Sequence, residues 1–294
     1  MKELTILLSA LSLSISVLGQ ARIEQIVPST AVQLRDPSAL SAAADGTLIV
    51  ADTGHNRVLA LSKAGELLQE VGSLGSGEGD FRWPRDVASE SALEIWIADF
   101  GNRRVCKLSR QFDVQGSFTV LAENSSTPEQ VGKIAASQQG DVFLYAEDSG
   151  QLLCYDPLFV LRASLGSNLG HEYIPRIRQL VFVAGKGIVW HSRGDEFLSM
   201  SDPLLTSLQS IPVGLDTLDE FVFCANKSKL IAAGTRGVFE LSFDGEPPEV
   251  LVSGQALRDL GIMQIDDAAA ASDSLLYLLE SKSGSIFRVT PENQ

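Results

Sequence analysis

Short apolar runs alternate with polar turns along most of this chain. In the first clear case, residues 48–51 lead through a polar segment at 52–56 into a second apolar run at 58–61. Runs this short, rich in Val, Ile and Leu and bounded by Gly, Asp and Asn, are typical of β-strands joined by tight turns. Further turns at Gly46 and Gly65 predict one more strand on each side, because glycine readily adopts the positive φ that such turns need. The pattern therefore predicts a four-stranded antiparallel meander.

The same pattern returns further along the chain with the same residues at its turn. The segment DTGHNRV at 52–58 recurs as DFGNRRV at 99–105, a spacing of 47 residues (99 − 52). Pro37 and Pro84 precede the two segments at the same spacing. Because several anchors move in register, the two stretches are copies of one structural unit, and tandem units of this kind fold as an array.

Four later copies are less well preserved. Each keeps two short apolar runs around a polar turn, and these turns lie at 148–151, 192–196, 234–237 and 280–285. In the third copy we place Glu147 at the position of the motif aspartate and Leu152 at that of the motif arginine. In the sixth copy Ser285 takes the arginine position. Six copies are expected in all.

The two ends of the chain are predicted to complete one unit between them. We expect the inner strand of the sixth copy around residues 262–265, followed by two more strands and no fourth. Residues 22–27 form a strand-like segment that belongs to no copy. Pairing of this segment in the sixth unit would close the ring and leave only short, protected edges. The predicted fold is thus all-β: a six-bladed β-propeller of four-stranded antiparallel blades, closed by the N-terminal strand.

The first 19 residues differ from the rest. A short polar start is followed by an apolar, serine-containing stretch at 4–18 and by Gly19 at a cleavage site. This arrangement is typical of a secretory signal peptide, and the stretch is too short for a comfortable membrane span. We expect residues 1–19 to be a signal peptide, with an uncleaved anchor as the alternative. Residues 20–294 are then a secreted or periplasmic propeller, monomeric and without a membrane span.

The charge of the chain disfavours one class of partner. The formal net charge is −14 at pH 7. Such a surface repels nucleic acid unless a local basic patch overrides the net field. The nearest approach to such a patch is Arg82 and Arg85 together with Arg176 and Arg178, and so few charges are better explained by ion pairs on a solvated face. No nucleic-acid partner is expected.

The repeated motif and the linker GSLGSGEGDFRWP at 72–84 resemble NHL repeats. That family has the form proline, turn, D-G, strand, A-D-x-x-N-x-R-V and strand, with a glycine-rich connection that ends in Phe and Pro. The resemblance is specific over residues 37–113 and generic afterwards. What NHL propellers share is the fold, so the resemblance implies binding more readily than it implies chemistry.

Within the motif, the polar side chains are best explained as parts of the turn. An aspartate can cap the backbone N–H groups of the turn, and the arginine can reach back to a carboxylate or to a neighbouring blade. Loss of the arginine in later copies fits this interpretation, because well-packed blades tolerate the loss of a turn clamp. The predicted structural set is Asp52, Asn56, Arg57, Asp99, Asn102 and Arg104.

A zinc enzyme is one catalytic alternative. Peptidyl-hydroxyglycine amidating lyases resemble this fold and bind zinc through three histidines, a ligand set that zinc accepts. The histidines of this chain are His55, His171 and His191. They fall in a turn, in a linker and at a strand end, so nothing in the sequence brings them together.

A calcium-dependent, gluconolactonase-like propeller is the other catalytic alternative. It would hold the ion with carboxylates and amides at the mouth of the channel. Carboxylates on or beside predicted inner strands are Asp86, Asp219, Glu220, Asp266 and Asp267. The asparagines expected in such a site are not evident, and no GxSxG, CxxC, HExxH or phosphate-loop motif occurs. No cofactor is expected, with calcium as the alternative.

The favoured hypothesis is a non-catalytic extracytoplasmic propeller that binds a protein, peptide or glycan on one rim. Loops of unequal length on a rigid scaffold are common sites of recognition, and aromatic and arginine side chains are common anchors. The candidates at the rim or channel mouth are Asp86, Phe100, Arg103, Tyr173, Arg178, Arg193, Glu220 and Asp267. A sensor module without a fused signalling domain is a third possibility, without positive support in the sequence.

Overall fold

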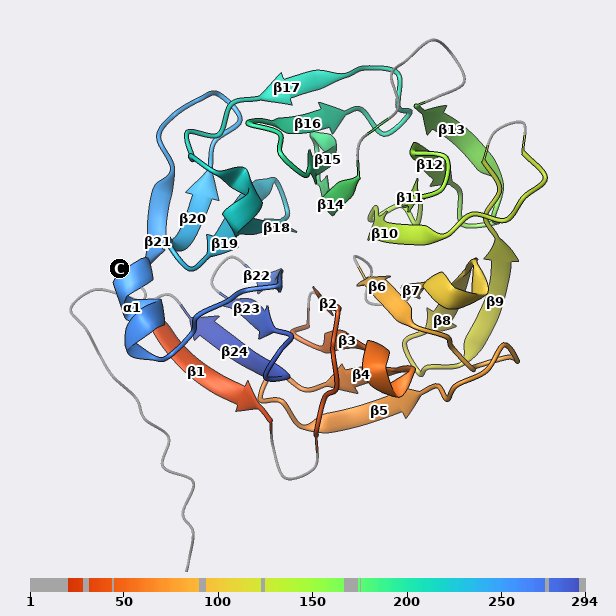
Figure 1. Ribbon diagram of the computed structural model, residues 1–294, viewed down its shortest axis with the longest axis horizontal. Coiled ribbons are helices and arrows are strands. Elements are labelled where there is room, and N and C mark those ends of the chain that lie inside the picture. Colours follow the sequence, from red (N-terminus) through yellow and green to blue (C-terminus); the bar gives the residue numbers. More distant parts are fainter. Residues whose placement is uncertain are drawn as a thin grey trace, which may run out of the picture.

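The strands form a closed ring of six sheets. The computed structural model describes residues 21–28, 32–43, 45–89, 94–122, 125–166, 174, 176–272 and 275–290. Within them, six four-stranded antiparallel sheets surround a common axis (Figure 1). The prediction of a six-bladed β-propeller with four-stranded blades is confirmed.

Each of the first three blades is a simple meander from the axis outwards. Blade 1 contains β2 (Ala39–Ala42), β3 (Leu48–Asp52), β4 (Arg57–Leu61) and β5 (Leu67–Val71). Blade 2 contains β6 (Pro84–Ala88), β7 (Glu94–Asp99), β8 (Arg104–Ser109) and β9 (Val114–Thr119). Blade 3 contains β10 (Val131–Ala136), β11 (Val142–Ala146), β12 (Gln151–Tyr155) and β13 (Leu161–Leu165).

Blades 4 and 5 repeat this order, and blade 6 takes its outer strand from the other end of the chain. Blade 4 contains β14 (Ile177–Val183), β15 (Gly187–Ser192), β16 (Leu198–Ser201) and β17 (Gln209–Ile211). Blade 5 contains β18 (Phe221–Asn226), β19 (Lys229–Gly234), β20 (Gly237–Leu241) and β21 (Glu249–Ser253). Blade 6 contains β22 (Asp267–Ser272), β23 (Leu275–Glu280), β24 (Ser285–Thr290) and β1 (Arg22–Val27).

The N-terminal strand closes the ring. β1 pairs antiparallel with β24, with Arg22 opposite Thr290 and Ile23 opposite Val289, at the outer edge of blade 6 (Figure 1). The predicted closure is confirmed, but the expected inner strand at 262–265 is wrong. That stretch belongs to the linker that follows α1 (Gly254–Asp259), and its isoleucines are buried in the apolar cluster shared by blades 5 and 6. The true inner strand β22 is rich in alanine and lacks the β-branched residues that usually mark a strand.

The core lies between blades rather than within one sheet. Every residue of β3 is buried, whereas the outermost strand β5 is largely exposed. One apolar cluster joins Ile49 and Val58 of blade 1 to Ile97 and Leu108 of blade 2. Because the second and third strands are covered on both faces, they have nearly continuous apolar sequences rather than an alternating pattern. Each large side chain buried in this way stabilises the ring by about 1.5–3 kcal/mol.

The antiparallel order gives the ring two distinct rims. The turns between the second and third strands of each blade lie at the same end as the linkers that lead to the next blade. We call this end the motif rim, because it carries η1 (Thr53–His55) and η2 (Phe100–Asn102) of the repeated motif. The other hairpin turns form the opposite rim.

Candidate functional site

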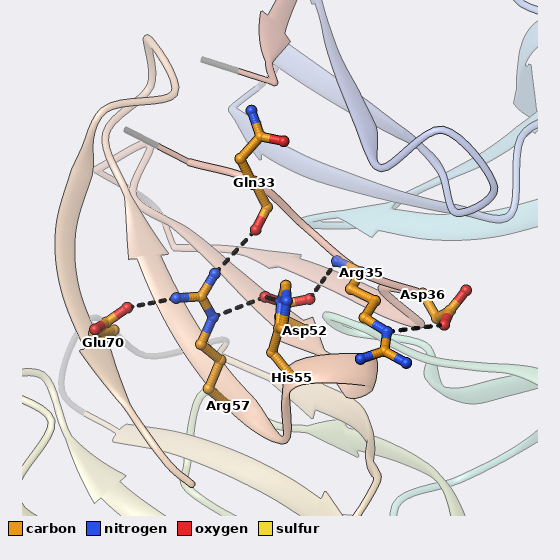
Figure 2. Close-up of polar contacts among 7 residues, drawn as sticks. All are labelled: Gln33, Arg35, Asp36, Asp52, His55, Arg57 and Glu70. Carbon is orange, nitrogen blue, oxygen red and sulfur yellow. Dashed lines mark hydrogen bonds and ion pairs between the residues drawn. The ribbon is translucent and has the colours of Figure 1, made fainter. Parts of the chain in front are cut away.

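The motif of blade 1 is a compact polar cluster at the motif rim (Figure 2). Asp52 ends β3 and its side chain is fully buried. Its Oδ1 accepts a hydrogen bond from the backbone N–H of Arg35 at 2.7 Å, and its Oδ2 accepts one from Nε of Arg57 at 2.8 Å. Nδ1 of His55 lies 2.9 Å from the same Oδ2. The carboxylate thus ties the turn to the linker that enters the blade.

Arg57 extends this cluster to the outer strand. Its Nη1 donates to Oε2 of Glu70 at 2.8 Å, and its Nη2 donates to the carbonyl of Gln33 at 3.0 Å (Figure 2). Gly54 is required by close approach, because a Cβ there would lie 2.6 Å from the carbonyl oxygen of Arg35. Asn56, which ends the turn, has φ 56°, in the left-handed region that asparagine tolerates.

Blade 2 reproduces the cluster with one exchange. Asp99 accepts from the backbone N–H of Arg82 at 2.8 Å and from Nε of Arg104 at 2.7 Å. Asn102 replaces the histidine and donates from Nδ2 to Oδ2 of Asp99 at 2.8 Å. The remaining guanidinium donors of Arg104 bond the backbone carbonyls of Ser76, Gly77 and Asp80. Both clusters therefore use their donors and acceptors within the chain, which leaves little capacity for a ligand.

In blade 3 the sequence alignment of the motif was wrong by one residue. Strand pairing sets Asp52 opposite Arg57 and Asp99 opposite Arg104, and it sets Ala146 opposite Gln151. Those two residues, rather than Glu147 and Leu152, hold the aspartate and arginine positions. The error arose because an acidic residue was matched by type instead of by its place in the ladder.

The inner strands surround a narrow channel. Its cavity is about 80 Å³ and is lined mainly by alanines and apolar side chains, with Asp86, Gln179 and Asp267 among the polar ones. These three residues occupy the same ladder position on their inner strands. At that position the inner strands of blades 1 to 6 carry Ala39, Asp86, Lys133, Gln179, Val222 and Asp267, respectively.

The two channel aspartates each bond to the next blade. Oδ2 of Asp86 in blade 2 accepts from the backbone N–H of Ile134 in blade 3 at 3.0 Å. Oδ2 of Asp267 in blade 6 accepts from the N–H of Leu40 in blade 1 at 2.7 Å, across the junction where the ring closes. Nζ of Lys133 lies 3.7 Å from Oδ2 of Asp86. These carboxylates act as clamps between inner strands.

Burial changes the acidity of both clamps. It raises the pKa of Asp86 although Lys133 and backbone hydrogen bonds oppose the change. Burial, with a smaller contribution from the nearby Asp86, raises the pKa of Asp267 to about 7, although Lys133 lowers it. Near neutral pH the channel therefore holds a carboxyl group that is only partly ionised. Shifted acids in a concave site are candidates for function, but burial of a structural carboxyl group raises its pKa in the same way.

The channel opens at the motif rim into a wider depression. This channel mouth has a volume of about 580 Å³ and is lined by Asp36, Pro37, Ser38, Arg85, Lys133, Gln264, Asp266, Ser281 and Lys282. Residues from blades 1, 2, 3 and 6 contribute to it. It is large enough for a small ligand group, since binding sites for small molecules start at roughly 300 Å³.

Comparison with known proteins gives the chain a family context. No family model matches it. A 74-residue segment, 23% of this chain, is 32% identical to NHL repeat-containing protein 2 of Gallus gallus, and the match spans 10% of that protein. A gluconolactonase from Xanthomonas campestris superposes with a TM-score of 0.64 at 12% identity, over 93% of this chain and 90% of that one. The chain is an NHL-like six-bladed β-propeller.

Other solved structures with different activities have a similar fold. Virginiamycin B lyase from Staphylococcus aureus with quinupristin matches the NHL-like propeller with a TM-score of 0.62 at 6% identity, over 92% of this chain and 88% of that one. The PQQ-bound aldose sugar dehydrogenase of Streptomyces coelicolor matches with a TM-score of 0.57 at 13% identity, over 92% and 98%. At such identities the likeness concerns the fold alone.

Two of the predicted rim residues lie on the turn of blade 2. The ring of Phe100 stacks under the guanidinium of Arg85, 4.5 Å from ring centroid to Cζ. Arg103 bridges to blade 3 of the propeller: its Nη1 lies 2.6 Å from Oδ2 of Asp148 and donates to the carbonyl of Pro128 at 2.7 Å. Both residues lie at the motif rim, and each is engaged with another part of the chain.

The other predicted residues do not gather at one point. Arg178 pairs with Asp219 at 3.3 Å, and Glu220, in η3 (Leu218–Glu220), lies 3.9 Å from Arg236. Glu220 does not line the channel, so only Asp86 and Asp267 of the proposed acidic group do so. Arg193 is exposed on the turn of blade 4. Tyr173 lies outside the described residues.

Three residues of interest were missed in the sequence. Trp83 is 57% exposed at the motif rim and has φ 53°, and its N–H donates to Oδ1 of Asn56 at 2.9 Å. Its equivalent in blade 1 is Asp36, with φ 45°. Comparing the two copies position by position would have revealed this exchange. Lys133 and Lys282 belong to eroded copies, where no motif marked their positions.

Metal-binding geometry is not found in the described part of the NHL-like propeller. There, no group of three or more His, Cys, Asp or Glu side chains is arranged to hold an ion. His191 is buried with Nε2 3.2 Å from the carbonyl of Asp195, and burial lowers its pKa. His171 lies outside the described residues.

The described residues also include no helix with the length and hydrophobicity needed to span a bilayer.

Proposed function

We propose that this NHL-like propeller is a non-catalytic extracytoplasmic scaffold that binds a protein, peptide or glycan on its motif rim. The observation that carries the proposal is Trp83, a large aromatic side chain held in a strained and exposed position. The expected signal peptide supports the extracytoplasmic location. The three-histidine zinc and the calcium alternatives have no cluster among the described residues to support them.

The position of Trp83 is costly for the fold. A bulky residue at positive φ is disfavoured, and the residue before a proline is restricted as well. Blade 1 satisfies the same backbone with Asp36, a residue that tolerates the left-handed region. Trp83 nevertheless leaves 57% of its surface exposed, so it gains only part of the burial that a tryptophan can provide. Strain together with an exposed aromatic ring is typical of a binding anchor.

The surroundings of Trp83 fit such a role. Asn56 from the motif turn of blade 1 fixes its backbone, so the indole is presented from a rigid support. The linker continues from Arg82 through Trp83 to Arg85, which lines the channel mouth. An aromatic ring between arginines is a favourable surface for recognition, because these residue types are enriched among binding anchors.

The channel interior is a poor place for catalysis. The carboxyl groups of Asp86 and Asp267 face a cavity of about 80 Å³, far below the roughly 300 Å³ at which small-molecule sites begin. Both groups are occupied by backbone hydrogen bonds to the next blade. Their raised pKa values are explained by burial in that structural role.

The test uses immobilised mature protein, residues 20–294, to retain ligands from the native envelope or medium and from peptide and glycan arrays. Trp83→Ser removes the proposed anchor. Leu204→Ser is the matched control, because it removes a side chain that is 62% exposed at the opposite rim. We expect a ligand to be retained by the unaltered chain and by Leu204→Ser, and to be lost with Trp83→Ser. Equal retention by both variants, or stoichiometric zinc or calcium in the purified protein, would overturn the proposal.

A further inference from the structure

The channel mouth contains cations whose hydrogen-bonding capacity is unused. Arg85, Lys133 and Lys282 line it, and none of their side-chain nitrogens donates a hydrogen bond to any residue that the structure describes. A guanidinium has five N–H donors and an ammonium has three. The nearest carboxylate oxygens lie at 3.6 Å from Arg85 and 3.7 Å from Lys133, beyond hydrogen-bond length.

The cations of the mouth differ in this respect from the arginines of the motif, whose hydrogen-bond donors are engaged. Nε and both terminal nitrogens of Arg104 are engaged by Asp99 and by backbone carbonyls, and Arg57 is saturated in a similar way. The half-buried arginines of the motif therefore have their donors satisfied within the chain. The side chain of Lys133 is only 15% exposed, so water can satisfy its ammonium group only in part. A cation held this way at the bottom of an open depression is prepared for an anionic partner.

The acidic side chains of the mouth do not supply hydrogen-bond acceptors to these cations. Oδ2 of Asp266 accepts the N–H of Ser281 at 2.7 Å, and its other oxygen accepts from the side chain of Gln264. Asp36 is 82% exposed and lies 4.0 Å from Arg35, so it faces solvent. The anions of the mouth are thus held at its edge, whereas Lys133 lies deep within it.

We propose that the channel mouth binds an oxyanion, a carboxylate or phosphate group of a ligand, with Lys133 at the base and with Arg85 and Lys282 at the sides. The inference rests on the proposed function, because it names the chemistry of the ligand at the same rim. Carboxylate and phosphate share the geometry that charged N–H donors recognise. The volume of about 580 Å³ accommodates such a group with the sugar or short chain that carries it.

Of the channel aspartates, Asp86 forms an ion pair with Lys133, and Asp267 is only partly ionised near neutral pH. Burial raises the pKa of both carboxyl groups, and that of Asp267 reaches about 7, so near neutral pH Asp267 carries less than its full charge. The charged groups that face Lys133 are these two acids and, across the mouth, Arg85, Lys282 and Asp266. Anion affinity is therefore expected to increase as the pH falls towards the acidic side of about 7 and Asp267 becomes neutral.

The experiment is calorimetric titration of the mature chain with D-glucuronate and with inorganic phosphate, at constant ionic strength. D-Glucose is the neutral control for the sugar. Saturable binding with a Kd of about 1 mM or tighter is expected for at least one anion and none for glucose. Whether glucuronate or phosphate binds more tightly distinguishes a carboxylate from a phosphate ligand. No saturable binding of either anion would overturn the inference.

Variants place the anion in the mouth. Lys133→Gln and Lys282→Gln are each expected to weaken binding, by about tenfold for the half-buried Lys133, since a hydrogen bond to a charged group contributes that order of affinity. Lys63→Gln, an exposed lysine at the opposite rim, is the matched control and should bind as the unaltered chain does. Lys282 is exposed, so its variant remains informative if Lys133→Gln does not fold. The assignment to the mouth would be overturned if Lys282→Gln and a folded Lys133 variant both bound the anion as tightly as the unaltered chain.

The two proposals fail in different ways. If neither anion binds while Trp83→Ser still abolishes ligand retention, the rim scaffold stands and the oxyanion inference is wrong. If an anion binds at the mouth while Trp83→Ser retains every ligand, the oxyanion inference stands and the tryptophan is not the anchor.

Discussion

The motif turns and the channel mouth contain the same residue types but use them in different ways. In the turns of blades 1 and 2, each arginine is bound to a fully buried aspartate and to further acceptors of the chain. In the mouth, Arg85 and Lys133 form ion pairs with Glu147 and Asp86 at 3.6 and 3.7 Å, but their side chains donate no hydrogen bond to a described residue. The first arrangement is closed and stabilises the blade. The second is open, and we associate it with a ligand.

This difference explains why the repeated residues are not the functional ones. Asp52 and Asp99 recur because the turns of blades 1 and 2 are held by the same clamp. At the shared ladder position of the inner strands, by contrast, the blades differ: two carry aspartate, one carries Lys133, one carries Gln179 and the others carry apolar residues. In a ring of copies, residues needed for the structure of a blade recur at the same position in other blades. Residues of a single binding site differ from one blade to the next.

The largest expected effect is at the closed cluster. Asp99→Ala removes a buried acceptor from the N–H of Arg82, from Nδ2 of Asn102 and from Nε of Arg104. Because removal of one partner of a buried pair leaves the other uncompensated, we expect the free energy of unfolding to fall by about 3 kcal/mol or more. Urea denaturation measures it.

Glu70→Gln is the matched control for that variant. It weakens a pair whose acidic partner is 52% exposed, and exposed pairs contribute at most about 1 kcal/mol. If Asp99→Ala cost no more than Glu70→Gln, the motif would not be a structural clamp, and the contrast with the mouth would be lost.

The fold was predictable because its signals are local and repeated. Strand, turn and spacing patterns sufficed for the number of blades and for closure by residues 22–27. The inner strand β22 was misplaced because alanines, which suit the crowded axis, carry no strand signal, whereas Ile262 and Ile265 of the neighbouring linker do. Strand boundaries that depend on tertiary packing cannot be predicted from the local periodicity of apolar residues.

The site was predictable only in part. Asp86 and Asp267 were identified from their place on inner strands, but Glu220 was grouped with them although it lies on a turn outside the channel. Lys133 was not identified because its role in the channel mouth depends on carboxyl groups that are distant in sequence. The left-handed backbone of Trp83 and the exposure of its ring are not revealed by the sequence alone.

A pH dependence of intermediate size is expected from the channel clamp. The pKa of Asp267 is raised from 3.8 to about 7 in the folded chain, so the folded state retains a proton there that the unfolded state has lost. Stability contributed by this group is therefore fully present below about pH 4 and is lost as the pH rises to about 7. Asp267→Asn keeps an acceptor for Leu40 but does not titrate.

Urea denaturation of both proteins across this pH range isolates the effect of Asp267. Relative to the unaltered chain, Asp267→Asn should gain stability as the pH rises, by on the order of 1–3 kcal/mol, and the difference should be constant at higher pH. A difference that is independent of pH would show that Asp267 is ionised throughout.

The smallest expected effect on stability is at the open site. Lys282→Gln removes an exposed cation that pairs with no acid among the described residues, so the free energy of unfolding should change by no more than about 0.5 kcal/mol. The same variant should weaken binding of the oxyanion. A large loss of stability would mean that the mouth is built for the fold rather than for a ligand.

The division between closed and open clusters is tested most directly by one pair of variants measured side by side. Arg104→Gln alters the turn and Arg85→Gln alters the mouth, and each replaces a guanidinium with the same amide. Calorimetric titration with the anion is carried out at a temperature well below both unfolding midpoints. The account predicts that Arg104→Gln binds as the unaltered chain does although it is less stable, and that Arg85→Gln loses affinity although its stability is nearly unchanged. Loss of binding in folded Arg104→Gln, or full affinity in Arg85→Gln, would contradict it.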